Sequence, residues 1–302
     1  MLASSRMTAL EPHQTAAISR LFSSSVIREL ARKGRSPLFT RLARQSHLLG
    51  TLPASERVYD LFEAAFSLLR RVGYRDEYIY KAALVRRILF GRHSLQTASM
   101  LNEFRVGDCK ADLAILNGTA TVYEVKSERD SLVRLQKQVA TYATVFAKVY
   151  VIASDSHVAA VESTVPHDVG ILVLNRRYQI STLREAFGTP EQTSAEAIFN
   201  SIRTDEARLV LALNGIEAPK VPNTALHAVL RQLFLKLDAA QAHAGMVQVL
   251  KRSRNLLPLS QLVSQLPDSL QTAALSVPLR KLDHARLITA INTPLEIAAA
   301  WA

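Results

Sequence analysis

Two runs of strand-forming residues meet at the dipeptide Asn117-Gly118, and this junction constrains the fold more than any other part of the chain. The runs are KADLAILN before the junction and TATVYEVK after it, and both are rich in β-branched or aliphatic residues. Asn-Gly between two such runs is a strong short-range signal for a β-hairpin. We therefore predict two antiparallel strands here, preceded by another strand over TASMLNEFRVG.

Two charged residues stand near the end of the strand that follows the turn. Glu124 and Lys126 are two positions apart, so their side chains point to the same face of a strand. On a solvent-facing strand such a pair needs no special explanation, and that surface reading is one alternative. On a buried face the two charges need a metal ion, a phosphate or another charge to compensate them.

The flanking segments alternate between helical and strand patterns. Apolar spacing predicts helices near 55–72 and 76–91, with Ser55 and Asp76 as candidate N-caps. Another helix is predicted over ERDSLVRLQKQVATYATVFAK, with a Ser127–Asp130 capping box at its start. The apolar runs VYVIAS and GILVLN predict strands covered on both faces, with a helix near 155–164 between them. The predicted fold class is therefore α/β, with a mixed sheet and flanking helices.

These elements divide the chain into three predicted parts. Residues 1–72 form a basic helical N-terminal arm, residues 73–183 the α/β core, and residues 184–302 a helical C-terminal domain interrupted by prolines. The first 50 residues hold eight Lys or Arg against two Glu, and the net charge of the chain is +11. This charge favours a polyanionic partner, with nucleic acid as the first candidate. The Arg- and Ser-rich start also fits an organellar presequence, which is a minority alternative.

The single cysteine and the short apolar runs argue against a disulfide-bonded, zinc-finger or membrane-spanning protein. Cys109 has no second cysteine to pair with, so no intrachain disulfide or zinc-finger spacing is present, and a cytoplasmic, reducing compartment fits best. No apolar run approaches the ~20 residues that a membrane-spanning helix needs. We therefore predict no membrane association.

The position of Asp112 depends on the geometry of the hairpin. A strict two-residue turn at Asn117-Gly118 places Asp112 opposite Tyr123, on the wrong face for Glu124. A three-residue loop or one bulge instead brings Asp112 to the face of Glu124 and Lys126. A site that combines these residues therefore requires an irregular hairpin.

Gln138 and Tyr142 complete a pattern that resembles a known superfamily. They lie one turn apart on the predicted helix that follows, and so share a face. An acid on one strand, E-x-K on its hairpin partner and Q-x-x-x-Y on the next helix resemble the PD-(D/E)xK nuclease superfamily, in its RecB-like branch. The order of elements over roughly residues 75–175 resembles the core of that superfamily. Ala111 stands where the superfamily often has Pro before the motif Asp.

The chain also resembles an uncharacterised bacterial group of such nuclease-like proteins. The superfamily resemblance implies a fold and an activity. The fold would be a restriction-endonuclease-like core, and the activity a metal-dependent hydrolysis of phosphodiester bonds, with DNA as the expected substrate. Asp112 and Glu124 would bind Mg²⁺ or Mn²⁺, with the carbonyl of Val125 as a further ligand, because hard cations prefer oxygen ligands. Lys126 would position the attacking water and stabilise developing negative charge.

The resemblance extends to residues around this centre. Gln138 and Tyr142 would orient the site or contact the substrate backbone. Glu77 would add a carboxylate, although an acid in the first turn of a helix is also favoured by the helix dipole, and Glu103 is its rival for that role. The predicted nucleic-acid contacts are the basic residues Arg105, Lys110 and Arg134.

Two other functions fit the same sequence. One is a non-catalytic nucleic-acid-binding or protein-interaction module that keeps the nuclease fold. The other is a component of a phage-defence or mobile-element assembly, whose C-terminal helical domain binds a protein partner. Cleavage of DNA that requires a metal ion would separate the enzyme from both.

Overall fold

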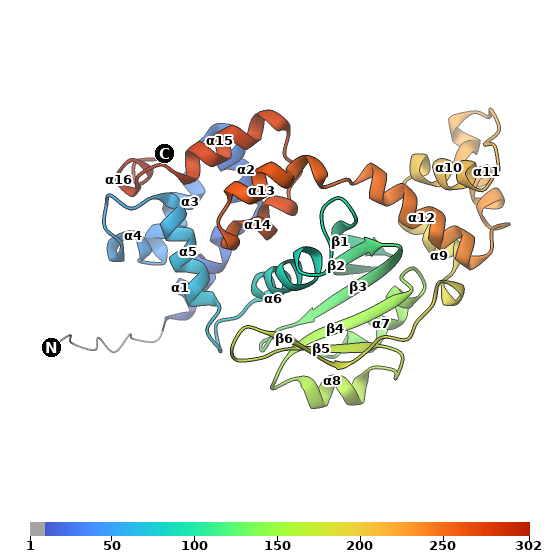
Figure 1. Ribbon diagram of the computed structural model, residues 1–302, viewed down its shortest axis with the longest axis horizontal. Helices are drawn as coiled ribbons and strands as arrows, with labels where there is room; N and C mark the ends of the chain where they lie inside the picture. The colour runs from blue at the N-terminus through green and yellow to red at the C-terminus, as the bar shows by residue number, and fades with distance from the viewer. Residues whose placement is uncertain (1–9) are drawn as a thin grey trace. The chain divides into compact units, whose positions relative to one another are not determined.

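The computed structural model describes residues 10–302, and Arg6 of the basic arm lies outside them. Two compact units make up the chain. One joins the described residues up to Ile79 with Gln261–Ala302, and the other is Tyr80–Ser260. Helices form the first unit, and a sheet with flanking helices forms the second (Figure 1).

The helical unit is built from both ends of the sequence. Its N-terminal helices are α1 (Pro12–Leu21), α2 (Ser24–Lys33), α3 (Pro37–Gln45), α4 (Leu48–Thr51) and α5 (Val58–Leu69). Its C-terminal helices are α13 (Ser260–Gln265), α14 (Asp268–Leu275), α15 (Lys281–Ile291) and α16 (Leu295–Ala298). α15 packs on α2, and α14 packs on α5. This division differs from the three predicted parts, because the last helices join the first ones in one body.

Specific contacts fasten the two ends to each other. Thr40 Oγ1 donates to the carbonyl of Ala298 at 2.7 Å, and the buried ring of Phe39 lies 5.9 Å from the ring of Trp301. The amide of Val58 donates to the carbonyl of Thr293 at 3.0 Å. These contacts satisfy backbone groups and bury aromatic surface on both sides.

The predicted helix starts in this unit have different outcomes. Ser55 is not the N-cap of α5, which begins at Val58 after Arg57, where Asp60 Oδ2 accepts from the Arg57 amide at 2.9 Å. Asp76 does cap the next helix, α6 (Glu77–Leu84), because its Oδ1 accepts from the amide of Ile79 at 3.1 Å. In both cases the helix begins where an aspartate side chain accepts a hydrogen bond from a backbone amide at its start.

A six-stranded mixed sheet forms the second unit, and five of its strands are those predicted from the sequence. Its strands lie in sequence order: β1 (Ser99–Val106), β2 (Cys109–Asn117), β3 (Thr119–Lys126), β4 (Lys148–Ser154), β5 (Gly170–Leu174) and β6 (Ile180–Arg184). β1 to β3 are antiparallel, β3 to β5 are parallel, and β6 returns antiparallel to β5. The edge strand β6 is absent from the sequence prediction, because its mostly exposed residues lack an apolar pattern.

Helices cover both faces of the sheet. α7 (Leu135–Ala143) and α8 (Val158–Thr164) connect the parallel strands and bury Val139 and Val161 against strand residues such as Val122 and Val151. The same core takes in the helices that follow: α9 (Ala195–Ser201), α10 (Thr204–Leu213), α11 (Asn223–Phe234) and α12 (Ala239–Ser253). A π-helix, η1 (Val85–Phe90), continues α6 and contributes residues over the opposite face. Figure 1 shows α7 and α8 beside the sheet.

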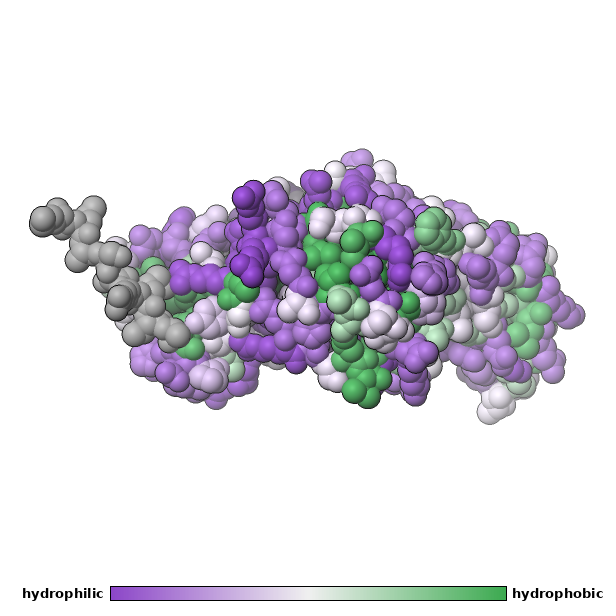
Figure 2. All heavy atoms as spheres, turned by 90° about the horizontal axis from the view of Figure 1, so that it is seen from below, coloured by the Kyte–Doolittle hydropathy of each residue, from purple (hydrophilic) through white to green (hydrophobic). Residues whose placement is uncertain are grey.

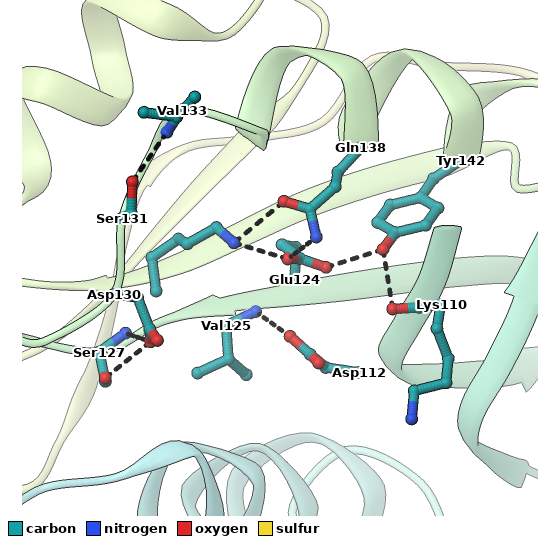
Figure 3. Close-up of polar contacts among 11 residues, drawn as sticks. Lys110, Asp112, Glu124, Val125, Ser127, Asp130, Ser131, Val133, Gln138 and Tyr142 are labelled. Atoms are coloured by element: carbon teal, nitrogen blue, oxygen red, sulfur yellow. Dashed lines mark hydrogen bonds and ion pairs between the residues drawn. The ribbon is translucent and has the colours of Figure 1, made fainter. Parts of the chain in front are cut away.

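The start of α7 is a correction to the sequence prediction. Ser127 and Asp130 do not form a capping box, because the helix begins at Leu135. The carboxylate of Asp130 instead accepts from the amide of Ser127 at 2.7 Å and from its hydroxyl at 2.6 Å, which closes a local turn (Figure 3). An acid three residues after a serine stabilises either arrangement, and here the turn forms.

The surface is mainly polar. Hydrophilic side chains cover most of the face drawn in Figure 2, with apolar side chains gathered in smaller areas between them. Within residues 10–302, every helix is too short or too polar to cross a lipid bilayer.

His243 on α12 places a titratable group inside the core of the sheet unit. It is 1% exposed, and its Nε2 accepts from the amide of Ala120 at the start of β3, at 3.4 Å. Burial lowers the pKa of His243 to about 4, while the charge of Glu191 opposes that shift. The contact with the amide requires the neutral imidazole, because a protonated Nε2 cannot accept.

We expect acid to destabilise the sheet unit through His243. Between its unfolded pKa of 6.5 and its folded pKa of about 4 the unfolded chain binds a proton that the folded chain does not. The free energy of unfolding should therefore fall as the pH falls, by roughly 2 kcal/mol at pH 5. Urea unfolding at pH 7 and pH 5 measures this loss, which should be smaller in His243→Gln. The matched control His167→Gln, at an exposed histidine, should keep the full loss. An equal loss in His243→Gln would contradict the assignment.

Candidate functional site

The β2–β3 hairpin meets the geometric requirement for a site. Asn117 pairs with Thr119, so Gly118 alone separates the paired residues, with φ of 72°. This register places Leu113 opposite Tyr123. One step further along the ladder, Asp112 is level with Glu124, which is the arrangement that the strict two-residue turn would have prevented.

Asp112 is tied directly to the strand of Glu124. Its Oδ2 accepts from the amide of Val125 at 2.8 Å, and its side chain is half-buried (Figure 3). On the neighbouring strand β1, Glu103 has a φ of 51° and lies between the residues of the Asn102–Leu113 and Phe104–Ala111 pairs. A non-glycine residue with positive φ is uncommon, and such conformations gather at functional sites.

The carboxylate of Glu124 is buried and receives three donors. Lys126 Nζ donates to its Oε1 at 2.7 Å, and Gln138 Nε2 donates to the same oxygen at 2.6 Å. The hydroxyl of Tyr142 lies 3.0 Å from its Oε2 (Figure 3). Glu124 is only 2% exposed, and Lys126 only 7%, so the alternative of a solvent-facing pair is wrong. The two opposite charges compensate each other inside the fold.

Gln138 and Tyr142 both point from α7 toward this carboxylate. Gln138 Oε1 accepts from Lys126 at 3.0 Å, so its amide bridges both members of the ion pair. The hydroxyl of Tyr142 also lies 3.0 Å from the carbonyl of Lys110 on β2 and can donate to it instead. Burial and the charge of Glu124 raise the pKa of Tyr142 well above its usual range, so the hydroxyl stays protonated. The helix face that carries Gln138 and Tyr142 therefore contacts the Glu124–Lys126 pair of β3.

The donor set suits a small hard cation. Asp112, Glu124 and the backbone carbonyl of Val125 offer oxygen atoms, and Mg²⁺ commonly uses one or two carboxylates with water and substrate phosphate as its other ligands. A carboxylate has about four acceptor positions, and the three donors to Glu124 leave one of them. Within residues 10–302 no group of three or more His, Cys, Asp or Glu side chains is placed to hold a metal. A cation held by Asp112 and Glu124 would therefore need most of its oxygen ligands from water or phosphate.

The two additional acidic residues, Glu77 and Glu103, are exposed. Glu77 is the first residue of α6 and belongs to the helical unit. Glu103 binds Lys110 Nζ at 2.9 Å, and this contact, with the charge of Lys81, holds the pKa of Glu103 below its usual range.

The basic residues near the site occupy different positions. Arg105 and Lys110 are cross-strand neighbours on β1 and β2, and Arg134 immediately precedes α7; all three are exposed. Lys81 on α6 was not among the predicted site residues, although it is 8% exposed and influences Glu103. A lysine within an otherwise apolar helical stripe is the sequence signal that identifies it.

Comparison with known proteins found a matching protein family. The model of a family described as bacteriophage P4 protein cII matches residues 70–255, which is more than half of the chain. The matched range contains all six strands and the whole Asp112–Tyr142 network. Protein cII of Enterobacteria phage P4 is 35% identical over 86 residues, which are 28% of this chain and 33% of that protein. The match thus spans a third of the relative's length. No solved structure matches the chain.

Proposed function

The chain belongs to the bacteriophage P4 protein cII family, and we propose that it is a metal-dependent nuclease that hydrolyses phosphodiester bonds of DNA. The sheet unit would then be a restriction-endonuclease-like core of the PD-(D/E)xK type. The observation that carries the proposal is the buried Glu124 carboxylate, contacted by Lys126, Gln138 and Tyr142 and level with Asp112 on the neighbouring strand. A fold that needed only stability would not require four polar side chains here, because apolar packing is equally stable or more so.

Each side chain of the network has a role in this proposal. Asp112 and Glu124, with the Val125 carbonyl, would hold Mg²⁺ or Mn²⁺. When bound, the cation would offset phosphate charge and acidify water. Lys126 has three N–H donors, of which Glu124 and Gln138 take two, so one can be donated to a water or a phosphate oxygen. Gln138 and Tyr142 fix the orientation of Glu124, which keeps the site preorganised.

Nucleic acid is the proposed partner because both units carry exposed cations. In the helical unit, α2 and α15 pack together and present exposed basic residues from both ends of the sequence, namely Arg28, Arg32, Lys33, Arg280, Lys281 and Arg286. In the sheet unit, Arg105, Lys110 and Arg134 are exposed. Contacts of this kind bind phosphates without reading bases, so we expect affinity that falls steeply with salt.

Cleavage assays test the proposal directly. The purified chain is incubated with plasmid, linear duplex and single-stranded DNA in Mg²⁺ or Mn²⁺, and in parallel with EDTA. We expect products only with the metal ions, and a Lys126→Ala variant that is folded by circular dichroism and still binds DNA should give none. Equal cleavage by that variant would indicate a contaminating enzyme and contradict the site. Binding without cleavage in any metal would favour a non-catalytic nucleic-acid-binding module.

The family match favours a mobile-element setting over a cellular one. Protein cII is a protein of Enterobacteria phage P4, and the residues matched by the family model include the proposed nuclease core. A protein partner bound by the helical unit would fit this setting. Since α13–α16 pack with α1–α5, the unit to be tested for such a partner is the two ends together, and not residues 184–302 alone.

A further inference from the structure

A pocket of about 230 Å³ opens on the sheet face opposite Glu124. Tyr123 and Tyr150, from the paired strands β3 and β4, line it, and strand side chains alternate, so Tyr123 points away from the face of Glu124. Arg87 and Arg92 line it from η1 and the residues after it, and Thr182 and Glu185 from β6 and its end. All these residues belong to the sheet unit.

Two arginines line the pocket, Arg87 from the π-helix Val85–Phe90 and Arg92 from the turn that follows it. Arg87 and Arg92 are five residues apart, a spacing that would turn them to different sides of an α-helix. The π-helix ends at Phe90, however, so Arg92 belongs to the turn that follows, where its amide donates to the carbonyl of Ile88 at 3.2 Å. Both arginines are exposed, and neither forms an ion pair within residues 10–302. Short π-helices recur at functional sites.

The tyrosine wall of the pocket depends on a glycine. The rings of Tyr123 and Tyr150 are stacked, with centroids 5.5 Å apart and an interplanar angle of 17°. Gly170 on β5 is paired with Tyr150, and a Cβ added there would lie 2.3 Å from the Tyr150 ring. Only glycine lets this ring lie flat on the sheet. The hydroxyl of Tyr150 donates to Glu185 Oε2, which holds the carboxylate at the pocket.

The pocket is small and has both cationic and anionic side chains in its lining. Two arginines without carboxylate partners favour a phosphate, which guanidinium groups bind through paired N–H donors. Glu185 accepts hydrogen bonds and repels a second anion, so the other end of the ligand must carry hydroxyl or amino donors. A volume of about 230 Å³ is smaller than the pockets that hold drug-sized ligands.

We propose that this pocket binds a small phosphate monoester, with the phosphate at Arg87 and Arg92 and a hydroxyl- or amino-bearing body toward Thr182 and Glu185. Nucleoside monophosphates and sugar phosphates share this chemistry. The site is separate from the proposed nuclease centre, because it lies on the other face of the sheet and uses none of the residues around Glu124.

Isothermal titration of the full chain tests the proposal, with EDTA present so that no metal-bound phosphate contributes. The probes are AMP, glycerol 3-phosphate, inorganic phosphate and adenosine. We expect one saturable site for at least one of the two esters, weaker binding of inorganic phosphate, and none of adenosine. Binding of AMP alone would identify a nucleotide site, and binding of both esters a more general phosphate-ester site. Absence of saturable ester binding at millimolar concentration would overturn the proposal.

Variants separate the pocket from general charge. Arg87→Gln with Arg92→Gln should weaken ester binding at least tenfold, whereas Arg208→Gln, an exposed arginine on α10, should leave it unchanged. Glu185→Gln should reduce the preference for esters over inorganic phosphate. Circular dichroism checks that the variants are folded. Equal affinity of the double arginine variant and the parent, or an equal loss in Arg208→Gln, would contradict the assigned pocket.

Discussion

An Asp112→Asn variant should fold normally and lose metal-dependent DNA cleavage, by roughly 100-fold or more. Asparagine is nearly the same size, and its side-chain oxygen can still accept from the amide of Val125, so the hairpin keeps its tie between β2 and β3. The variant loses the negative charge that would bind a divalent cation. A loss of about 3 kcal/mol in transition-state stabilisation corresponds to the stated factor. Initial rates on plasmid DNA over a range of Mg²⁺ concentrations measure the effect.

The neighbouring Asp108 provides the matched control. It lies in the turn between β1 and β2, is exposed, and pairs with Lys137 on α7. Asp108→Asn makes the same chemical change a few residues away, and its cleavage rate should equal that of the parent. A parental rate in Asp112→Asn would contradict the assignment of Asp112, and an equal fall in both variants would point to a general loss of charge.

The parts of the fold that were predicted correctly depend on local signals. Asn117-Gly118 between two strand-forming runs specifies a hairpin, and the apolar runs at 149–154 and 170–175 specify buried strands, because turn chemistry and periodicity act over a few residues. Asp112, Glu124, Gln138 and Tyr142 were expected to converge once the hairpin register allowed it. The register of the hairpin could not be predicted from the sequence. Adding one residue to the loop shifts the pairing by one position and moves Asp112 to the other face relative to Glu124.

The parts that were missed depend on contacts between distant residues. The hydrogen bond from Thr40 to Ala298 and the packing of Phe39 on Trp301 join segments that are more than 250 positions apart. Periodicity identifies the helices but not their partners. Local chemistry was also ambiguous: Ser127 and Asp130 fit a capping box as well as the turn that they form. Nor does spacing reveal that Gln138 contacts both charges of the ion pair.

The Glu124–Lys126 pair should also control the stability of the sheet unit. Lys126→Met keeps the size of the side chain and removes its charge, which leaves the carboxylate of Glu124, 2% exposed, without a cation. Breaking a buried pair in this way costs about 3–5 kcal/mol. We expect a loss of that size in the free energy of unfolding, measured with urea at pH 7. The control Lys137→Met removes an exposed lysine from its pair with Asp108 and should change it by less than about 1 kcal/mol.

A double variant distinguishes a lost charge from lost packing. Glu124→Gln combined with Lys126→Met removes both charges, and Gln at position 124 can still accept from Gln138 and Tyr142, which now contact Glu124. Because replacing a whole buried ion pair is often neutral, most of the lost stability should return. If the double variant is as unstable as Lys126→Met, the cost comes from packing of the lysine stem and not from the unpaired carboxylate. A folded double variant that does not cleave DNA would then separate the chemical role of these residues from their structural one.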